Sequence, residues 1–271
     1  MSTRLASARC FKVTEQIIQV TENFWNIRGS FRIGGVVDIG TQASLVRLSS
    51  GSFLLLDSYA FSDSVVQEIN AILDGGDIEA ILNLHPFHTV HVERAHELFP
   101  EARLYGTQRH LDRFPELPWE EVRSEDPELH EWYADDLEFT IPRGVDFISD
   151  NENVHFSSVL AYPRESGTIH VDDTLMYIRL PRLLGLVGLR DRVGFHPTLA
   201  MALEKREGAA AEFREWAEEF AEAWGDAENL CAAHSGTLLA TTNRGASIPE
   251  RVRKALGRCE LVLGRHERRY G

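Results

Sequence analysis

The sequence predicts an α/β protein in which two β-sheets pack face to face and helices cover their outer faces. Short runs rich in β-branched and aromatic residues are followed by helical segments, and this order occurs twice along the chain. The 271 residues are enough for one large domain or two small ones. Because no stretch has the composition of a linker, we expect a single domain over residues 1–271.

The first half of the chain predicts strands with two intervening helices. The helix expected at 62–76 begins after a Ser or Asp cap and ends at Gly75 and Gly76. The next strand is a nearly continuous apolar run, "IEAILNL", which is typical of a strand buried on both faces. The expected strands are 17–33, 43–59 (a hairpin around "SSG"), 78–84 and 102–107, and the second helix is 92–100.

The second half predicts a further set of strands followed by long helices. Residues 113–133 contain proline and tryptophan and predict a loop or lid, in which Trp119, Trp132 and Tyr133 are candidates to wall a substrate site. The strands expected after this loop are 137–142, 155–163, 168–178 and 228–234, and the helices are 196–224 and 248–266.

Composition excludes several classes of function. The formal charge of −14 argues against nucleic-acid binding, which requires a basic face. No apolar run approaches the roughly 20 residues that span a bilayer, and the N-terminus lacks the apolar core of a signal peptide. Cys10, Cys231 and Cys259 are an odd, widely spaced set that predicts free thiols in a reducing compartment. We therefore expect a cytoplasmic protein with no membrane or nucleic-acid partner.

Histidines are concentrated in one short segment, "LHPFHTVHVERAH", at residues 84–96. Because proline favours the first position of a helix, His85 is expected at the end of the strand, and His88 and His91 in the first turns of the following helix. His85 and His88 are then able to share one metal ion, and imidazole suits zinc, iron or copper. His91 is a weaker candidate, and His96 is assigned to the surface.

Other candidate residues also lie next to predicted strands. The acidic pair Asp172 and Asp173 ends a strand, where buried carboxylates are costly unless they are solvated, hydrogen-bonded or bound to a cation. His234 ends a late strand, and His155 begins an earlier one. A simple acidic turn and structural histidines are the alternative interpretation of these residues. His110, His170 and His196 are more consistent with structural or supporting roles than with ligation.

The order of these motifs resembles the metallo-β-lactamase-fold superfamily, from about residue 17 to about residue 240. "GSFLLLDSY" places Asp57 at the acidic position of an early strand pair, and "IEAILNLHPFHTVH" resembles the strand and loop that carry the H-x-H-x-D-H signature. "RESGTIHVDDTL" places Asp173 at the metal-bridging aspartate, and "LCAAHSG" places His234 at the last histidine ligand. The likeness is strongest to a branch with an altered metal motif.

The resemblance implies a four-layer αββα metallo-β-lactamase-like sandwich that holds zinc or iron. The implied nitrogen ligands are His85, His88, His155 and His234, with Asp173 as the carboxylate ligand, and the implied supporting or proton-transfer groups are His91, His170, Asp172 and His196. Because Asp172 is adjacent to Asp173 in a predicted strand, its side chain is expected to turn away. Val90 stands where the signature has an aspartate that serves a second metal, so we expect one firmly bound ion.

The expected function is that of a metal-dependent hydrolase acting on a small molecule, with metal-activated water attacking an ester, lactone, amide or phosphoester. The alternative is a non-catalytic binding protein of the same fold with a degenerate metal site. A third possibility is an iron- or flavin-linked redox protein, although the chain has no flavodoxin-like second domain. The sequence leaves the substrate, the identity of the metal and the oligomeric state open.

Overall fold

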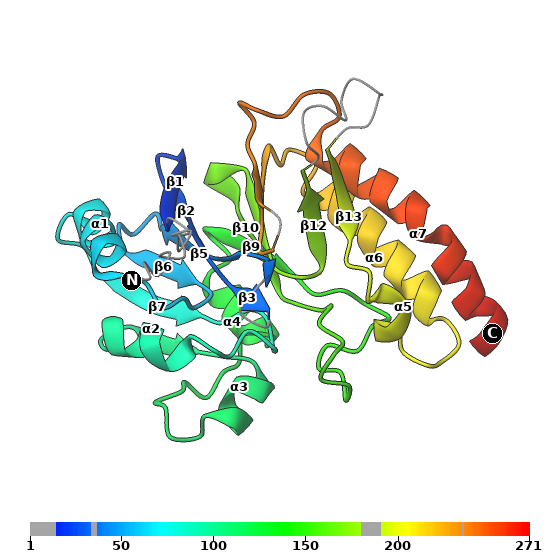
Figure 1. Cartoon of the computed structure of the whole chain (residues 1–271), viewed down its shortest axis with the longest axis horizontal. Helices are drawn as coiled ribbons and strands as arrows, with labels where there is room; N and C mark the ends of the chain where they lie inside the picture. Colours follow the sequence, from blue (N-terminus) through cyan, green and yellow to red (C-terminus); the bar gives the residue numbers. More distant parts are fainter. Residues whose placement is uncertain (1–14, 34–36, 180–190, 235) are drawn as a thin grey trace, which may run out of the picture.

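The computed structural model describes residues 15–33, 37–179, 191–234 and 236–271, and within them two β-sheets lie between two layers of helices (Figure 1). This arrangement confirms the predicted α/β sandwich. The first sheet has the order β1-β2-β5-β6-β7-β8 and the second the order β15-β14-β11-β10-β9. Cys10 lies outside the described residues, as does the N-terminal segment that was expected to lack a signal peptide. In the described part of the chain, no helix is long and apolar enough to cross a membrane.

The first sheet and its helices come from the N-terminal half of the chain. The strands are β1 (Gln16–Thr21), β2 (Phe24–Gly29), β5 (Thr41–Arg47), β6 (Phe53–Leu56), β7 (Ile78–Leu82) and β8 (Arg103–Tyr105), and the helices are α1 (Asp63–Leu73), α2 (Val92–Leu98) and α3 (Gln108–Arg113). A two-stranded ribbon joins β3 (Arg32–Ile33) to β4 (Val37–Asp38). α1 ends with Asp74 and Gly75 at φ values of 48° and 86°, in the left-handed conformation that the predicted glycine stop requires.

The second sheet and its helices come from the C-terminal half. The strands are β9 (Leu137–Thr140), β10 (Leu160–Pro163), β11 (Thr168–Val171), β14 (Asn229–Ala232) and β15 (Gly236–Leu238), with the hairpin β12 (Leu175–Ile178) and β13 (Arg192–Phe195) beside them. The helices are α4 (Pro127–Trp132), the short 3₁₀ turn Arg164–Ser166, α5 (Leu199–Ala202), α6 (Ala209–Ala223) and α7 (Ile248–Tyr270).

Strand β6 shows how the sequence builds the layers. Successive side chains of a strand point to opposite faces, and all four residues of β6 are apolar because both faces of the sheet are covered. Phe53 and Leu55 pack with residues of α1 on the outer face, whereas Leu54 and Leu56 pack against the second sheet. A third core lies between the outer face of the second sheet and helices α6 and α7. Three apolar layers therefore separate the four layers of backbone.

Several expected elements differ from the structure. The strand expected at 168–178 is divided into β11 and β12. Residues 113–133 include helix α4. Trp119 and Tyr133 pack into the apolar cores, with the ring of Trp119 5.9 Å from that of His110, while Trp132 is 51% exposed. The helix expected at 196–224 is divided into α5 and α6, because the backbone becomes extended at Leu203 and the next helix starts only after Gly208, which has a φ of 83°. His155 does not begin a strand, since β10 starts at Leu160.

The topology brings several chain segments to one edge of the sandwich. β6 and β7 run parallel, as do β11 and β14, so their carboxyl ends meet at the same edge of each sheet. Asp57 follows β6, His85 follows β7, Asp173 follows β11 and His234 follows β14. Side chains that are far apart in the sequence therefore meet at this edge.

Candidate metal centre

His85 and His88 lie on a loop, not on a helix. The chain leaves β7 at Leu82, turns through a hydrogen bond from the amide of His88 to the carbonyl of His85 (3.1 Å), and starts α2 only at Val92. The expectation that His88 lies in the first turn of a helix is therefore wrong. Pro86 disfavours helical backbone at His85, and the loop that results stacks the two imidazole rings with centroids 4.1 Å apart.

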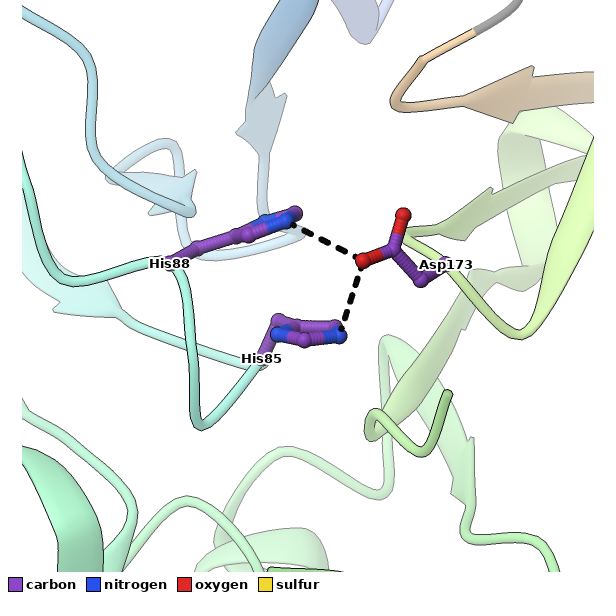
Figure 2. A group of neighbouring side chains, drawn as sticks. All are labelled: His85, His88 and Asp173. Carbon is purple, nitrogen blue, oxygen red and sulfur yellow. Dashed lines mark ion pairs between the residues drawn. The ribbon is translucent and has the colours of Figure 1, made fainter. Parts of the chain in front are cut away.

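The carboxylate of Asp173 lies between three imidazoles. Its Oδ2 atom is 3.4 Å from Nε2 of His85 and 3.5 Å from Nε2 of His88 (Figure 2), and its Oδ1 atom is 3.2 Å from Nε2 of His234. Nε2 of His234 is also 3.3 Å from Nε2 of His88. Neighbouring ligands at about 2.0–2.1 Å from a tetrahedral zinc ion are about 3.3 Å apart. The printed contacts are close to this spacing, and the ligand atoms of His85, His88 and Asp173 all lie within 4.8 Å of one another, with His234 beside Asp173 and His88.

The hydrogen bonds of His234 fix which ring nitrogen is free to bind an ion. Its Nδ1 atom lies 2.8 Å from the carbonyl oxygen of Gly40, which only accepts, so Nδ1 carries the proton. Nε2 then holds a lone pair and faces a carboxylate oxygen of Asp173. Two lone pairs at this distance repel each other, so a cation between them relieves the repulsion.

The Nε2 atom of His85 supports the same interpretation. It is fully buried and has no hydrogen-bond partner among the described residues, which is costly for a polar atom. Ligation through Nε2 moves the ring proton to Nδ1 and removes the bond that the Phe87 amide now donates there at 3.1 Å. One hydrogen bond contributes about 1 kcal/mol, against about 10 kcal/mol or more for binding a structural zinc ion, so ligation prevails. The residues fit a divalent metal.

The electrostatics of the site depend on its burial. Burial and the nearby charge of His88 hold the pKa of His85 well below its usual range. Burial also opposes protonation of His88, but the carboxylates of Asp172 and Asp173 hold its pKa well above the usual range. Burial raises the pKa of Asp173, but the facing imidazoles outweigh burial and hold that pKa well below the ordinary value. In the absence of an ion, the site therefore holds a carboxylate and a protonated His88 together.

A second group of buried polar side chains lies directly behind the first. His170 contacts Asp57 through Nε2 (2.7 Å) and Ser44 through Nδ1 (2.9 Å), and Oδ1 of Asp57 accepts the backbone N–H of Leu84 (2.8 Å). Asp57 adopts a φ of 61°, which is uncommon for a residue other than glycine. His170 and Asp57 already have partners at both polar atoms of each side chain, so they act as a hydrogen-bonded support for the loop that carries His85.

Asp172 belongs to this second group. The expectation that its side chain turns away is wrong, because β11 ends at Val171 and the strand alternation does not continue into the turn. Oδ1 of Asp172 lies 3.6 Å from Nδ1 of His88, and neither of its oxygens has a hydrogen-bond partner among the described residues. Burial and the charge of Asp172 together raise the pKa of Asp57.

Arg28 is a functional candidate that the sequence analysis missed. From β2 it donates to the carbonyl oxygens of Ala232 and Ala233, each at 2.7 Å, and to Oε1 of Gln42 at 2.9 Å. It joins the two sheets at the edge that carries the site, and the negative charge of Asp172 opposes the burial that lowers its pKa. The available signal was that Arg28 is the one charged residue in the segment "FWNIRGSF".

The remaining predicted histidines lie around the cluster. The ring of His155 stacks on Phe87 and lies 6.2 Å from that of His85, and its Nε2 atom is 2.8 Å from the carbonyl of Glu152. His91 occupies the N-cap position of α2, and its ring packs against that of Tyr59 with the centroids 5.1 Å apart. Their nitrogens are therefore not among those that converge on Asp173.

His196 and His110 support the site from two sides. Nδ1 of His196 accepts a hydrogen bond from the amide of Thr198 (3.3 Å) and lies 2.7 Å from the hydroxyl of the same residue, so the other ring nitrogen carries the proton in the neutral ring. Burial lowers the pKa of His196. Nε2 of His110 lies 3.5 Å from the carbonyl of His88, and its Nδ1 accepts from the amide of Thr107.

Comparison with solved structures identifies the fold. The chain matches the metallo-β-lactamase from Erythrobacter litoralis with β-mercaptoethanol in its active site (TM-score 0.59, 14% identity, 90% of this chain and 96% of that one). It also matches the metallo-β-lactamase FIM-1 from Pseudomonas aeruginosa in its mono-zinc form (TM-score 0.57, 11% identity, 92% and 97%). The metallo-β-lactamase from Hirschia baltica is similar (TM-score 0.52, 13% identity, 92% and 97%). No protein-family model and no curated protein matches the sequence significantly.

The chain therefore has the metallo-β-lactamase fold, an α/β sandwich, as the resemblance implied. Sequence identities of 11–14% establish the fold and leave the reaction to be argued from the site.

Proposed function

We propose that the protein is a metal-dependent hydrolase that holds one divalent ion between His85, His88, Asp173 and His234. The observation that carries this proposal is the convergence of three imidazoles, from two separate segments, on the single carboxylate of Asp173. Zinc is the ion that a set of three nitrogens and one oxygen favours, and iron is the alternative. A small-molecule substrate and a cytoplasmic location complete the proposal.

The chemistry proposed is attack of water on an ester, lactone, amide or phosphoester. A divalent ion in such a site supplies Lewis acidity and makes water acidic enough to ionise at a pH of about 7. His88 presents Nε2 to the site while its Nδ1–H faces Asp172, which fixes the ring orientation. Asp57 and His170 hold the loop through the amide of Leu84.

His196 is the proposed proton donor. Its Nδ1 atom is occupied by Thr198, so Nε2–H is the group available to donate to a substrate oxygen. Burial lowers its pKa, so the ring is neutral at neutral pH and able to donate through one nitrogen only. The hydroxyl of Thr198 also contacts the carbonyl of His155 (3.1 Å), which ties this group to the segment beside His85.

Elemental analysis of untagged protein tests the metal, and assays with simple esters, lactones and phosphoesters test the reaction. We expect one equivalent of metal, lost in Asp173→Asn and retained in His96→Gln. His96 is a half-buried histidine of α2 outside the cluster, so it is a matched control for loss of an imidazole. Metal retained by Asp173→Asn at full occupancy contradicts the proposed ligand set.

A non-catalytic binding protein is the second candidate function. Val90 favours it, because the side chain at this position of the motif is 67% exposed and offers no ligand atom. In that case the protein binds one metal ion, and no substrate of the panel is hydrolysed faster than by the Asp173→Asn variant. An absorption spectrum of the purified protein tests the redox alternative, which requires visible bands from iron or flavin.

A further inference from the structure

A concave site lies in the C-terminal half, between β12, β13, β15 and the first turns of α7. This site, the α7 pocket, has a volume of about 640 Å³. Its cationic lining residues are Arg192, Arg244, Arg251, Lys254 and Arg258. They come from β13, from the loop before α7 and from one side of α7 itself, so three chain segments supply positive charge to one concavity.

This concentration of positive charge is unusual in a protein with a net charge of −14. Two arginines on the facing sides of α6 and α7 are paired with glutamates: Arg253 with Glu218 at 3.1 Å, and Arg214 with Glu260 at 3.0 Å. None of the five pocket cations forms an ion pair with any described residue. The charges of Arg214 and Arg253 are therefore neutralised within the fold, whereas those of the pocket cations are not.

The five cations differ in how they are held. Arg251 is fixed by bonds to the carbonyl of Ala246 (3.1 Å) and to Oδ1 of Asn243 (2.7 Å), and Arg258 donates to the carbonyl of Val193. These bonds leave the positive charges without a countercharge. The side chains of Arg192, Arg244 and Lys254 have no hydrogen bond among the described residues and are exposed. Arg251 and Arg258 are thus held in place by hydrogen bonds, and the side chains of Arg192, Arg244 and Lys254 are free to move onto a ligand.

The one carboxylate in the lining is Asp191, whose side chain accepts a hydrogen bond from the hydroxyl of Tyr177 at 2.8 Å. Five positive charges therefore face a single acid at this wall. Burial lowers the pKa of Arg258, and the charge of Arg192 lowers it further. Mutual repulsion of this kind destabilises the fold, and a multiply charged anion in the pocket removes it.

We propose that the α7 pocket binds a small phosphorylated molecule that carries two or more negative charges. The guanidinium forks of Arg192, Arg244 and Arg258 suit bidentate contacts with phosphate oxygens, and Lys254 adds a mobile point charge. The volume exceeds what one phosphate group fills, so the rest of the ligand lies against the apolar side chains of Val193 and Leu238. The inference is independent of the proposed hydrolase activity.

Calorimetric titration of the full-length protein with inorganic pyrophosphate, at low ionic strength, tests the proposal. We expect saturable binding of one equivalent, with inorganic phosphate binding more weakly. Arg244→Gln and Lys254→Gln should each weaken pyrophosphate binding by about tenfold, the effect of one lost charge-assisted contact. Both residues are exposed, so neither substitution disturbs the apolar core.

Arg253→Gln is the matched control, because it removes an equal charge next to Lys254 on the face of α7 that pairs with Glu218. It should leave pyrophosphate binding unchanged. The proposal is overturned if pyrophosphate does not bind, or if Arg253→Gln weakens binding as much as Lys254→Gln. It is also overturned if binding persists in both pocket variants but is abolished by a chelator, since the anion then binds at the metal centre. Binding of single-stranded DNA as tight as that of pyrophosphate would indicate a general polyanion surface instead.

Discussion

The Nδ1 atom of His88 lies 3.6 Å from Oδ1 of Asp172, while Nε2 of the same ring faces Asp173 at 3.5 Å. One imidazole thus connects the carboxylate that we assign to the metal with a carboxylate that has no hydrogen-bond partner among the described residues. A carboxylate behind a ligand histidine orients the ring and increases its basicity, and its loss costs about 10–100-fold in metal affinity.

We therefore predict that Asp172→Asn weakens metal binding by about 10–100-fold without changing the stoichiometry. Competition with a chromophoric chelator measures the affinity. Asp173→Asn is the comparison and should reduce the affinity much further, because it removes a ligand. Equal losses in the two variants would show that Asp172 also binds the ion directly.

Arg28→Met should destabilise the protein by at least about 2 kcal/mol, because it leaves two carbonyl oxygens and one side-chain amide without their charged donor. Arg28→Lys keeps the charge but not the fork that contacts Ala232 and Ala233 together, so its effect should be intermediate. Urea unfolding of metal-free protein gives both values. If the lysine variant is as unstable as the methionine variant, the fork geometry rather than the charge is what the fold requires.

His110 predicts a pH dependence of stability. Burial lowers its pKa to about 4 from the ordinary value of 6.5. The unfolded chain then binds a proton that the folded chain does not, so stability is complete above pH 6.5 and is lost as the pH falls toward 4. Between pH 7 and pH 5 this residue should account for about 2 kcal/mol of lost stability.

Unfolding curves of wild type and His110→Asn at several pH values between 5 and 7 measure this contribution. The asparagine keeps an acceptor for the Thr107 amide but cannot take up a proton in this range. The variant should be less stable at pH 7 and should lose less stability on acidification. Parallel curves for the two proteins would mean that His110 is not the source of the pH dependence.

The fold was predictable because its signals are local. Apolar runs such as "IEAILNL" and "FLLL" indicate strands buried on both faces, and the glycines after α1 mark its end. The proximity of His234 and Asp173 was predictable because parallel strands place their carboxyl ends at one edge. These features depend on short-range patterns and on a small set of rules for connecting strands.

The parts that sequence reasoning missed depend on contacts between distant segments. The partners of Arg28 lie about two hundred positions along the chain, at Ala232 and Ala233, and no periodicity reveals them. The orientation of Asp172 depends on β11 ending at Val171, whereas a continuous strand was expected over 168–178. The helical placement of His88 failed because Pro86 is compatible both with a helix start and with the turn that the loop adopts.

The number of metal ions is the last prediction. Three buried carboxylates, Asp57, Asp172 and Asp173, lie at the edge of the sandwich that carries the site, and the charge of Arg28 interacts with that of Asp172. One divalent ion and Arg28 together balance three negative charges, so a second divalent ion would leave excess positive charge in a buried site. Val90 is 67% exposed, so an aspartate there would lie in solvent and not among the buried ligands. We therefore predict one equivalent of metal after extensive dialysis, both in the wild type and in Val90→Asp. A second equivalent retained by Val90→Asp alone would show that the loop moves residue 90 into the ligand position that the H-x-H-x-D-H signature assigns to aspartate.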